Sequence, residues 1–431
     1  MRRYLLSSLL WTTLAAAQEP AEGWNIYFQA TSIGQYHGAF PALYSGADSL
    51  AAHREAEVSL TSTVFLGLRP FPNTQLYFDP ELAGGRGFSG VTGIANAPNG
   101  ELPRVASATP KPYLARLYVT QDFGFGSERE TVESDANQLG GSRPMTRYSV
   151  TVGRFTVTDF FDNNRYSHDP RKQFMGWGTM YNGAWDYPAD TRGYTWGWMH
   201  EFHARRWSVR YASVAEPRVA NGLRFDRRLW RNRGDVAEGE LRGETGGRAG
   251  AVRVLAYVNH ARAGSYADTL KMAAPDVTAT RRDGTRKYGF GLSADQEIAK
   301  GVGVFGRLGW NDGKTESFAF TAIDRLATMG VSVSGERWKR PHDTAATALT
   351  VSGISAVHAA YLARGGLDFL IGDGALNYGR ETVSETYYAA QVVEGGFVTV
   401  ALQHVTNPAY NRDRGPVWIG SLRLHVEWGK R

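Results

Sequence analysis

The chain has 431 residues and no cysteine, which excludes a disulfide framework and thiolate chemistry. The formal charge of +6 falls to +4 when Arg2 and Arg3 of an N-terminal leader are set aside. This charge is mild and no long run of Lys and Arg follows, so we expect no nucleic-acid partner.

The N-terminus reads MRRYLLSSLLWTTLAAAQEP, where two arginines precede an apolar run over residues 4–14 and three alanines. This order predicts a secretory signal peptide over residues 1–17, cleaved after Ala17. The alternative, a membrane anchor, would need about 20 apolar residues. No later window is long and uncharged enough, so membrane residence of the mature chain would require strands. Since no linker divides residues 18–431, we expect one domain there.

Polar and apolar residues alternate with period two along most of this part, which predicts strands. Residues 55–66 are one example, with Glu57 and Thr61 on one face and Val58 and Leu60 on the other. We expect about sixteen strands, centred near Tyr27, Leu60, Leu76, Leu117, Val150, Trp198, Val209, Glu240, Val254, Gly291, Phe305, Val331, Leu349, Ala389, Val400 and Leu422.

The connections between these strands alternate between long loops and short turns, and residues 124–145 are an exception because they are too long for a tight turn. Gly is frequent (50), as are aromatic residues (12 Trp, 21 Tyr and 20 Phe). Together these features predict an all-β fold, a transmembrane antiparallel up-and-down barrel of about sixteen strands. A soluble sandwich would bury both inner faces, whereas the second face here is polar.

The polar face predicts which side chains line the lumen. For any single arginine there, an ordinary solvated charge is the simpler interpretation. Their recurrence beside acidic residues makes a charge-lined channel about equally well supported, and excess guanidinium would favour neutral or anionic solutes over cations. The strand residues that we assign to the solute path are Arg116, Arg210, Glu240, Arg242, Arg253, Arg307 and Arg423.

Residues 155–194 break the alternation with aromatic rings, amides and charges of both signs. We interpret this stretch as an ordered functional loop, and strand parity makes it the third long loop. Residues 153–197, together with RVANGLRFD at 218–226 and the run 353–388, resemble the carbohydrate-selective porins of the OprB type. The resemblance implies a Gram-negative outer-membrane barrel that passes sugars inward by facilitated diffusion, narrowed by a third loop folded into the lumen.

The residue types of this loop suit sugars, which present hydroxyl groups and apolar C–H faces. Carboxylates, amides and guanidinium groups can bind the hydroxyls, and aromatic rings can lie against the faces. The loop residues that we assign to the solute path are Asp159, Asp162, Asn163, Asn164, Arg165, Trp177, Tyr181, Trp185 and Tyr187.

We predict a sugar porin without a cofactor, metal or catalytic residue. HEFH at residues 200–203 lacks the helical zinc spacing, GWNDGKT at 309–315 is one residue short of a phosphate loop, and no G-x-S-x-G occurs. A general or anion-preferring porin is the nearest alternative, followed by an outer-membrane barrel enzyme and a secreted carbohydrate-binding protein.

Besides sugars, we expect outer-membrane lipids and the barrel-assembly machinery as partners, and self-association stays open. The resembling family places an aromatic residue at or near the C-terminus, whereas here three residues follow Trp428.

Overall fold

The structure is a computed structural model that describes residues 21–102, 108–318 and 320–429. The predicted signal peptide at residues 1–17 and the last two residues lie outside the described residues.

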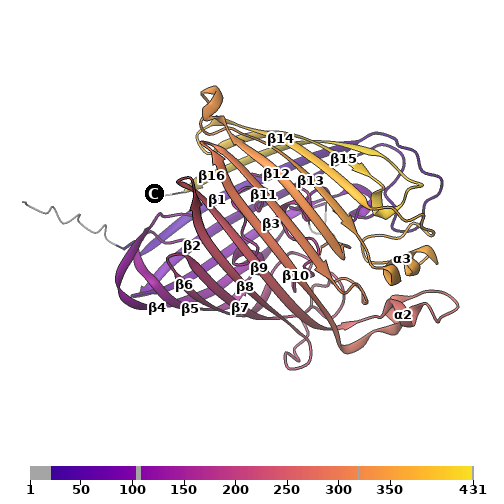
Figure 1. The fold of residues 1–431 in the computed structure, drawn as a ribbon, viewed down its shortest axis with the longest axis horizontal. Helices are drawn as coiled ribbons and strands as arrows, with labels where there is room; N and C mark the ends of the chain where they lie inside the picture. The colour runs from indigo at the N-terminus through magenta and orange to yellow at the C-terminus, as the bar shows by residue number, and fades with distance from the viewer. Residues whose placement is uncertain (1–20, 103–107, 319, 430–431) are drawn as a thin grey trace, which may run out of the picture.

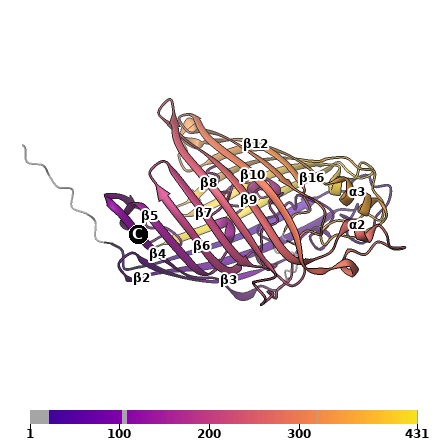
Figure 2. The same cartoon turned by 60° about the horizontal axis from the view of Figure 1, so that its bottom comes forward.

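Sixteen antiparallel strands form one closed barrel, in which each strand pairs with its neighbours in sequence and β1 pairs with β16 (Figures 1 and 2). All sixteen predicted strand centres fall inside strands, so the predicted up-and-down barrel is confirmed. The strands are β1 (Trp24–His37), β2 (Glu55–Phe71), β3 (Thr74–Gly85), β4 (Lys111–Val132), β5 (Gly141–Phe155), β6 (Thr195–Ala204), β7 (Trp207–Ala215), β8 (Arg233–Thr245), β9 (Arg248–Ala263), β10 (Arg282–Ala299), β11 (Val302–Asn311), β12 (Arg325–Ser334), β13 (Thr344–Gly353), β14 (Glu381–Val393), β15 (Gly396–Thr406) and β16 (Val417–Gly429).

The outer surface of the barrel is apolar because the period-two alternation sends one side chain in and the next out. Val58, Leu117, Val254 and Leu422 are exposed there, whereas their neighbours Ser59, Arg253 and Arg423 are buried. Exposed aromatic side chains lie at both ends of this belt, among them Trp196, Trp418, Trp207 and Trp428. This is the surface that a bilayer requires of a barrel.

Long and short connections alternate as the sequence predicted. Residues 72–73, 205–206, 246–247, 300–301 and 394–395 are tight turns at one end. The long loops at the other end carry α2 (Tyr266–Thr269) and α3 (Ala356–Ala363), as Figure 1 shows. The described residues of the connections also contain the 3₁₀ turns η1 (Phe88–Gly90), η2 (Val157–Asp159), η3 (Val277–Thr280), η4 (Gly335–Trp338) and η5 (Pro408–Tyr410).

No helix among the described residues is long and apolar enough to cross a membrane.

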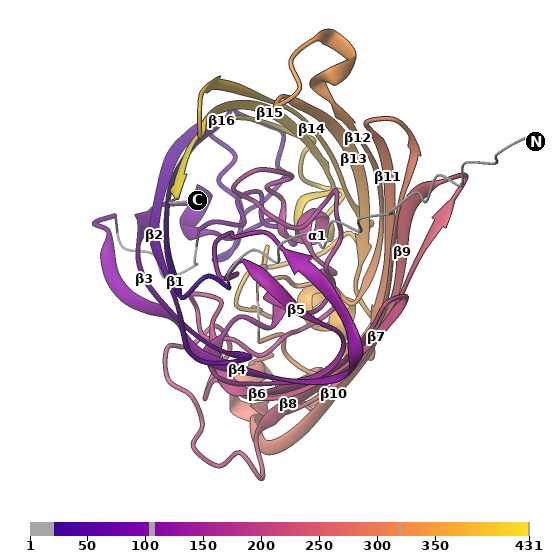
Figure 3. The same cartoon turned by 90° about the vertical axis from the view of Figure 1, so that its left-hand side faces the viewer.

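The core of the molecule lies inside the barrel, because the third long loop, residues 156–194, fills part of the lumen. Figure 3 looks along the barrel and shows α1 (Trp177–Met180) of this loop within the ring of strands. Side chains of the loop, among them Phe161 and Trp185, pack against inward side chains of the wall such as Met199 and Leu255. The loop is therefore packed into the hydrophobic core and is not an exposed surface loop.

Candidate constriction of the channel

Buried charges on the barrel wall hold the third loop in place. Arg307 on β11 is 1% exposed and donates from Nε to Asp162 Oδ1 at 3.0 Å. Glu385 on β14 accepts the backbone N–H groups of Met175 at 2.6 Å and Gly176 at 3.0 Å. Removing one partner of such a buried pair leaves an uncompensated charge, so these contacts resist displacement of the loop. Asp162 and Arg307, predicted to line the path, are placed by the structure in this anchor.

Three other predicted loop residues also serve the internal structure, and a fourth, Arg165, does not. Asn164 donates from Nδ2 to Ser293 Oγ and to the carbonyl of Ala294 on β10, both at 3.2 Å. Asn163 donates to a carbonyl within its own loop. Trp185 is 1% exposed in the core, and the exposed Arg165 guanidinium lies over the Tyr166 ring.

A second loop, between β3 and β4, also enters the lumen and was not predicted. Asn96 accepts the N–H of Gly178 at 2.5 Å through its side chain, and Trp177 donates its N–H to the carbonyl of Ala97 at 3.0 Å. Glu381 on β14 accepts the N–H of Asn96 at 2.7 Å. The two loops are thus joined to each other, and both are bound by carboxylates of β14. The sequence signal in the second loop, IANAPNG, is a set of turn formers that equally favours an exposed loop.

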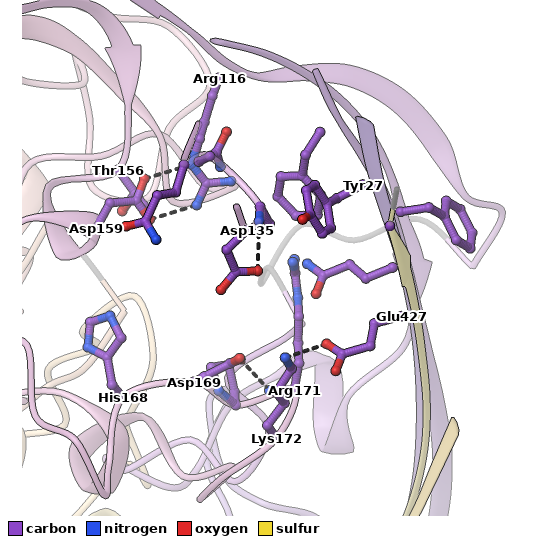
Figure 4. A pocket seen from close by; sticks show the side chains of 18 of the residues that line it. Tyr27, Arg116, Asp135, Thr156, Asp159, His168, Asp169, Arg171, Lys172 and Glu427 are labelled. Carbon is purple, nitrogen blue, oxygen red and sulfur yellow. Dashed lines mark hydrogen bonds and ion pairs between the residues drawn. The ribbon is translucent and has the colours of Figure 1, made fainter. Parts of the chain in front are cut away.

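A cavity of about 1870 Å³ extends from these two loops to the end of the barrel with the short turns. In outer-membrane barrels the short turns face the periplasm, so this is the periplasmic side of the lumen. Inward side chains of β1, β4 and β14–β16 form its wall, opposite the third loop. Figure 4 shows some of the charged side chains that line it, among them Arg116, Asp159, Arg171 and Glu427.

Two arginine forks lie where the cavity meets the loops. Arg116 on β4 donates from Nε and Nη2 to the two oxygens of Asp159 at 2.6 and 2.7 Å, and from Nη1 to Asp79 at 3.3 Å. Arg171 of the third loop donates from Nε to Glu101 of the second loop at 2.7 Å. The predicted Arg116 and Asp159 therefore lie together on the cavity wall. Arg171 and Glu101 are additions that only the fold brings into position.

Aromatic rings form the adjoining wall. Trp177, Tyr181 and Tyr187 line the cavity, as does Tyr194, which the sequence reasoning missed. Burial raises the pKa of Tyr181 far above its ordinary value, so its hydroxyl is neutral. His168 lies beside it, with ring centroids 5.0 Å apart, and burial followed by the nearby Arg307 lowers the imidazole pKa. A neutral imidazole has one donor and one acceptor, as sugar hydroxyls require.

The remaining predicted strand residues lie inside the barrel but in ion pairs and loop contacts elsewhere. Arg210 pairs with Glu201, Glu238 and Glu240 at 3.1, 3.0 and 2.8 Å. Arg242 and Arg253 contact the same Glu240, at 3.0 and 3.7 Å.

Arg423 donates to two loop carbonyls, those of Pro170 and Gln173, at 2.7 Å each. Of the seven strand residues that we predicted, the cavity lining within the described residues includes Arg116.

The charge of this lining differs from the predicted excess of arginine. Its cations are Arg116, Arg171, Lys172 and Arg192, four in all. Its carboxylates are Glu22, Glu101, Glu133, Asp135, Asp159, Asp169, Glu394 and Glu427, eight in all. The expectation that guanidinium dominates the lumen does not hold for this cavity, because most inward arginines are neutralised inside the wall.

A model of the carbohydrate-selective porin family, OprB family, matches residues 68–428. The chain belongs to this family. Among solved structures, this porin is similar to a high-pH structure of Pseudomonas putida OprB, with a TM-score of 0.69 and 14% identity over 94% of each chain. A low-pH structure of the same protein gives a TM-score of 0.50 and 12% identity over 94% of this chain and 93% of that chain. None of the curated proteins matches the sequence.

Family and fold together define the class of the protein. The porin resides in the outer membrane and passes sugars, and its fold is that of a channel rather than an enzyme. The likeness to the solved structures concerns the fold, since the identities are low.

Proposed function

We propose that sugars diffuse toward the periplasm past the two loops and through the described cavity, in contact with the Arg116–Asp159 pair and the rings of Trp177, Tyr181 and Tyr187. The observation that carries this proposal is that charged forks and ring faces border one cavity. Forks bind hydroxyls and rings bind the C–H face, which are the two surfaces of a sugar.

The pairing of Arg116 with Asp159 supports weak, transient binding of sugars rather than tight binding. The Arg116 guanidinium is already bound by Asp159 at 2.6 Å, so a sugar hydroxyl competes with an existing partner instead of filling an empty site. Conduction needs such weak binding, because a tight site would retain its solute. We therefore expect block constants for sugars in the millimolar range.

The test is current block in a planar bilayer, measured across a panel of mono- and disaccharides. Glucose or an oligosaccharide at millimolar concentration should reduce the ion current. A current that no sugar reduces, with free permeation of phosphate or chloride, would favour the general or anion-preferring porin instead. The acidic lining argues against the anion-preferring alternative, because a surplus of carboxylates repels anions.

We further propose a passive channel without enzymatic activity. The family match and the barrel fold support this proposal, because both are those of a channel. Purified protein should release no fatty acid from outer-membrane lipids, and measurable release would contradict this.

The proposal includes a mature chain of residues 18–431 in one barrel domain, in contact with lipid through its apolar belt and inserted by the barrel-assembly machinery. Protein recovered from membranes should begin at Gln18 by N-terminal sequencing. Native mass spectrometry from detergent will show whether copies associate.

A further inference from the structure

The connection between β4 and β5, residues 133–140, lies within residues 124–145, which the sequence showed to be too long for a tight turn, and we call it the flap. It does not extend into the periplasm but lies against the inner wall of β1. Asn25 donates from Nδ2 to the Gln138 carbonyl at 2.9 Å and to Ser134 Oγ at 3.1 Å. Tyr27 donates its hydroxyl to the same Ser134 Oγ at 3.0 Å. The flap is thus inserted from the periplasmic end.

The flap also reaches the constriction. Asn137, with a φ of 56°, donates from Nδ2 to Asp79 Oδ2 at 2.9 Å. Asp79 is also the second acceptor of the Arg116 guanidinium. Leu139 is 2% exposed in the hydrophobic core and donates its N–H to the Tyr77 hydroxyl at 3.2 Å. Apolar burial and amide contacts therefore fix the flap beside the arginine fork that the third loop contacts from the other side.

The flap forms part of the cavity wall and carries charge into it. Residues 133–138 and Gly140 all line the cavity, and Figure 4 shows Asp135 projecting into it. Over the described ranges, Glu133 and Asp135 take part in no ion pair, unlike Glu101, Asp159 and Glu427. Lys172 interacts with Asp135 only through the longer-range field. Carboxylates that form no ion pair raise the local concentration of cations in a narrow wet passage and lower that of anions.

We propose that the flap is the exit-side wall of the sugar path, and that Glu133 and Asp135 make this exit favour neutral and cationic sugars, such as protonated amino sugars, over sugar acids. The substrate part of this inference rests on the proposed sugar transport. The part that concerns the position of the flap does not depend on sugar transport, because ions that cross the channel pass the same wall. The two parts can therefore be tested separately.

The placement test uses the absence of native cysteine. The variant Asp135→Cys is inserted into a planar bilayer and treated with a cationic or an anionic methanethiosulfonate reagent. Modification should lower the single-channel conductance by roughly twofold, because the label occupies the passage. The matched control is Ser127→Cys, on an exposed residue of β4 outside the described cavity lining. Equal conductance before and after modification of Asp135→Cys would overturn the placement.

The selectivity test uses the double variant Glu133→Gln with Asp135→Asn, which keeps the shape of the flap. The potassium-to-chloride permeability ratio should fall by roughly twofold. Block by glucosamine should weaken, block by glucuronate should strengthen, and block by glucose should stay the same. An unchanged ratio and unchanged glucosamine block would refute the charge assignment. If no sugar blocks the wild-type current while labelling still lowers the conductance, the proposed sugar transport fails and the placement stands.

Discussion

Replacement of Arg116 by Ala tests the proposed constriction most directly. The side chain makes two charge-assisted hydrogen bonds to Asp159, at 2.6 and 2.7 Å, and one to Asp79 at 3.3 Å. Its removal takes the one cation away from two carboxylates. We therefore expect two separate effects, one on the passage of ions and one on the binding of sugar.

The size of both effects follows from these contacts. Two charges 4 Å apart in water interact by about 1 kcal/mol, which corresponds to a change of roughly fivefold in the permeability of each ion, upward for a cation and downward for an anion. A hydrogen bond to a charged group contributes about 1.5–3 kcal/mol, so the loss of one such bond to a sugar hydroxyl weakens block by about ten- to a hundredfold.

The assay measures reversal potential in a potassium chloride gradient and current block by glucose on the same channel. Arg116→Lys separates the two effects, because lysine keeps the charge but lacks the planar fork. Its permeability ratio should stay near wild type while its sugar block weakens. Arg210→Ala is the matched control, since it removes the same charge from a buried cluster of carboxylates outside the described cavity lining. If Arg116→Ala and Arg210→Ala behave alike, the assignment of the constriction is wrong.

Further predictions concern the anchors of the loops. Arg307→Met should loosen the third loop by about 3–5 kcal/mol and give noisy, larger currents, whereas quiet wild-type currents would show that the loop does not depend on this pair. Glu385→Gln should raise current noise less, because one neutral acceptor oxygen remains to bind backbone N–H groups, and noise equal to that of Arg307→Met would contradict this ranking. His358 of α3 is buried between Asp324 at 3.2 Å and Asp368 at 3.3 Å; burial alone would lower its pKa, but the two carboxylates raise the pKa to about 9. This pKa lies above the value of about 6.5 in the unfolded chain. The contacts of His358 with the two carboxylates therefore contribute of the order of 3 kcal/mol to the free energy of unfolding below pH 6.5, and this contribution is lost as pH rises through about 9. Limited proteolysis of the outer loops should therefore accelerate at pH 10 in the wild type and show no such rise in His358→Gln.

The barrel was predictable because its determinants are local. The alternation in β2, where Val58 and Leu60 face out and Ser59 and Thr61 face in, can be read from neighbouring residues alone. Turn length likewise depends on a few adjacent residues, as at Gly246 and Gly247, whose φ values of 60° and 73° suit a tight hairpin. A closed sheet is then expected, because an open sheet of these strands would leave two edge strands with unpaired backbone groups.

The site was only partly predictable, because facing inward does not decide what a side chain meets there. Arg116 and Arg307 occupy equivalent inward positions on their strands, and alternation treats them alike. They differ in the loop residue that each one contacts. Arg307 and Asp162 are more than a hundred positions apart in the sequence, so local patterns do not reveal their contact. The flap and the second loop were missed for the same reason, since turn formers such as Asn96 and Asn137 predict a bend but not its destination.

The polar side chains inside the barrel therefore have two roles, anchoring the loop and contacting the solute. The extent to which protein groups enclose a side chain distinguishes the two roles. Arg307 is fully enclosed and donates to Asp162 and to carbonyls of the loop, so no solute can reach it without moving the loop. The Arg116 side chain keeps 11% exposure and borders the cavity while its carboxylate partners hold it in place. A sugar filter needs both kinds of residue, because weak contacts select between similar solutes only when the groups that make them cannot shift. The anchors thus set how selective the fork can be, and this is why loosening Arg307 should reduce discrimination among sugars even though it contacts none of them.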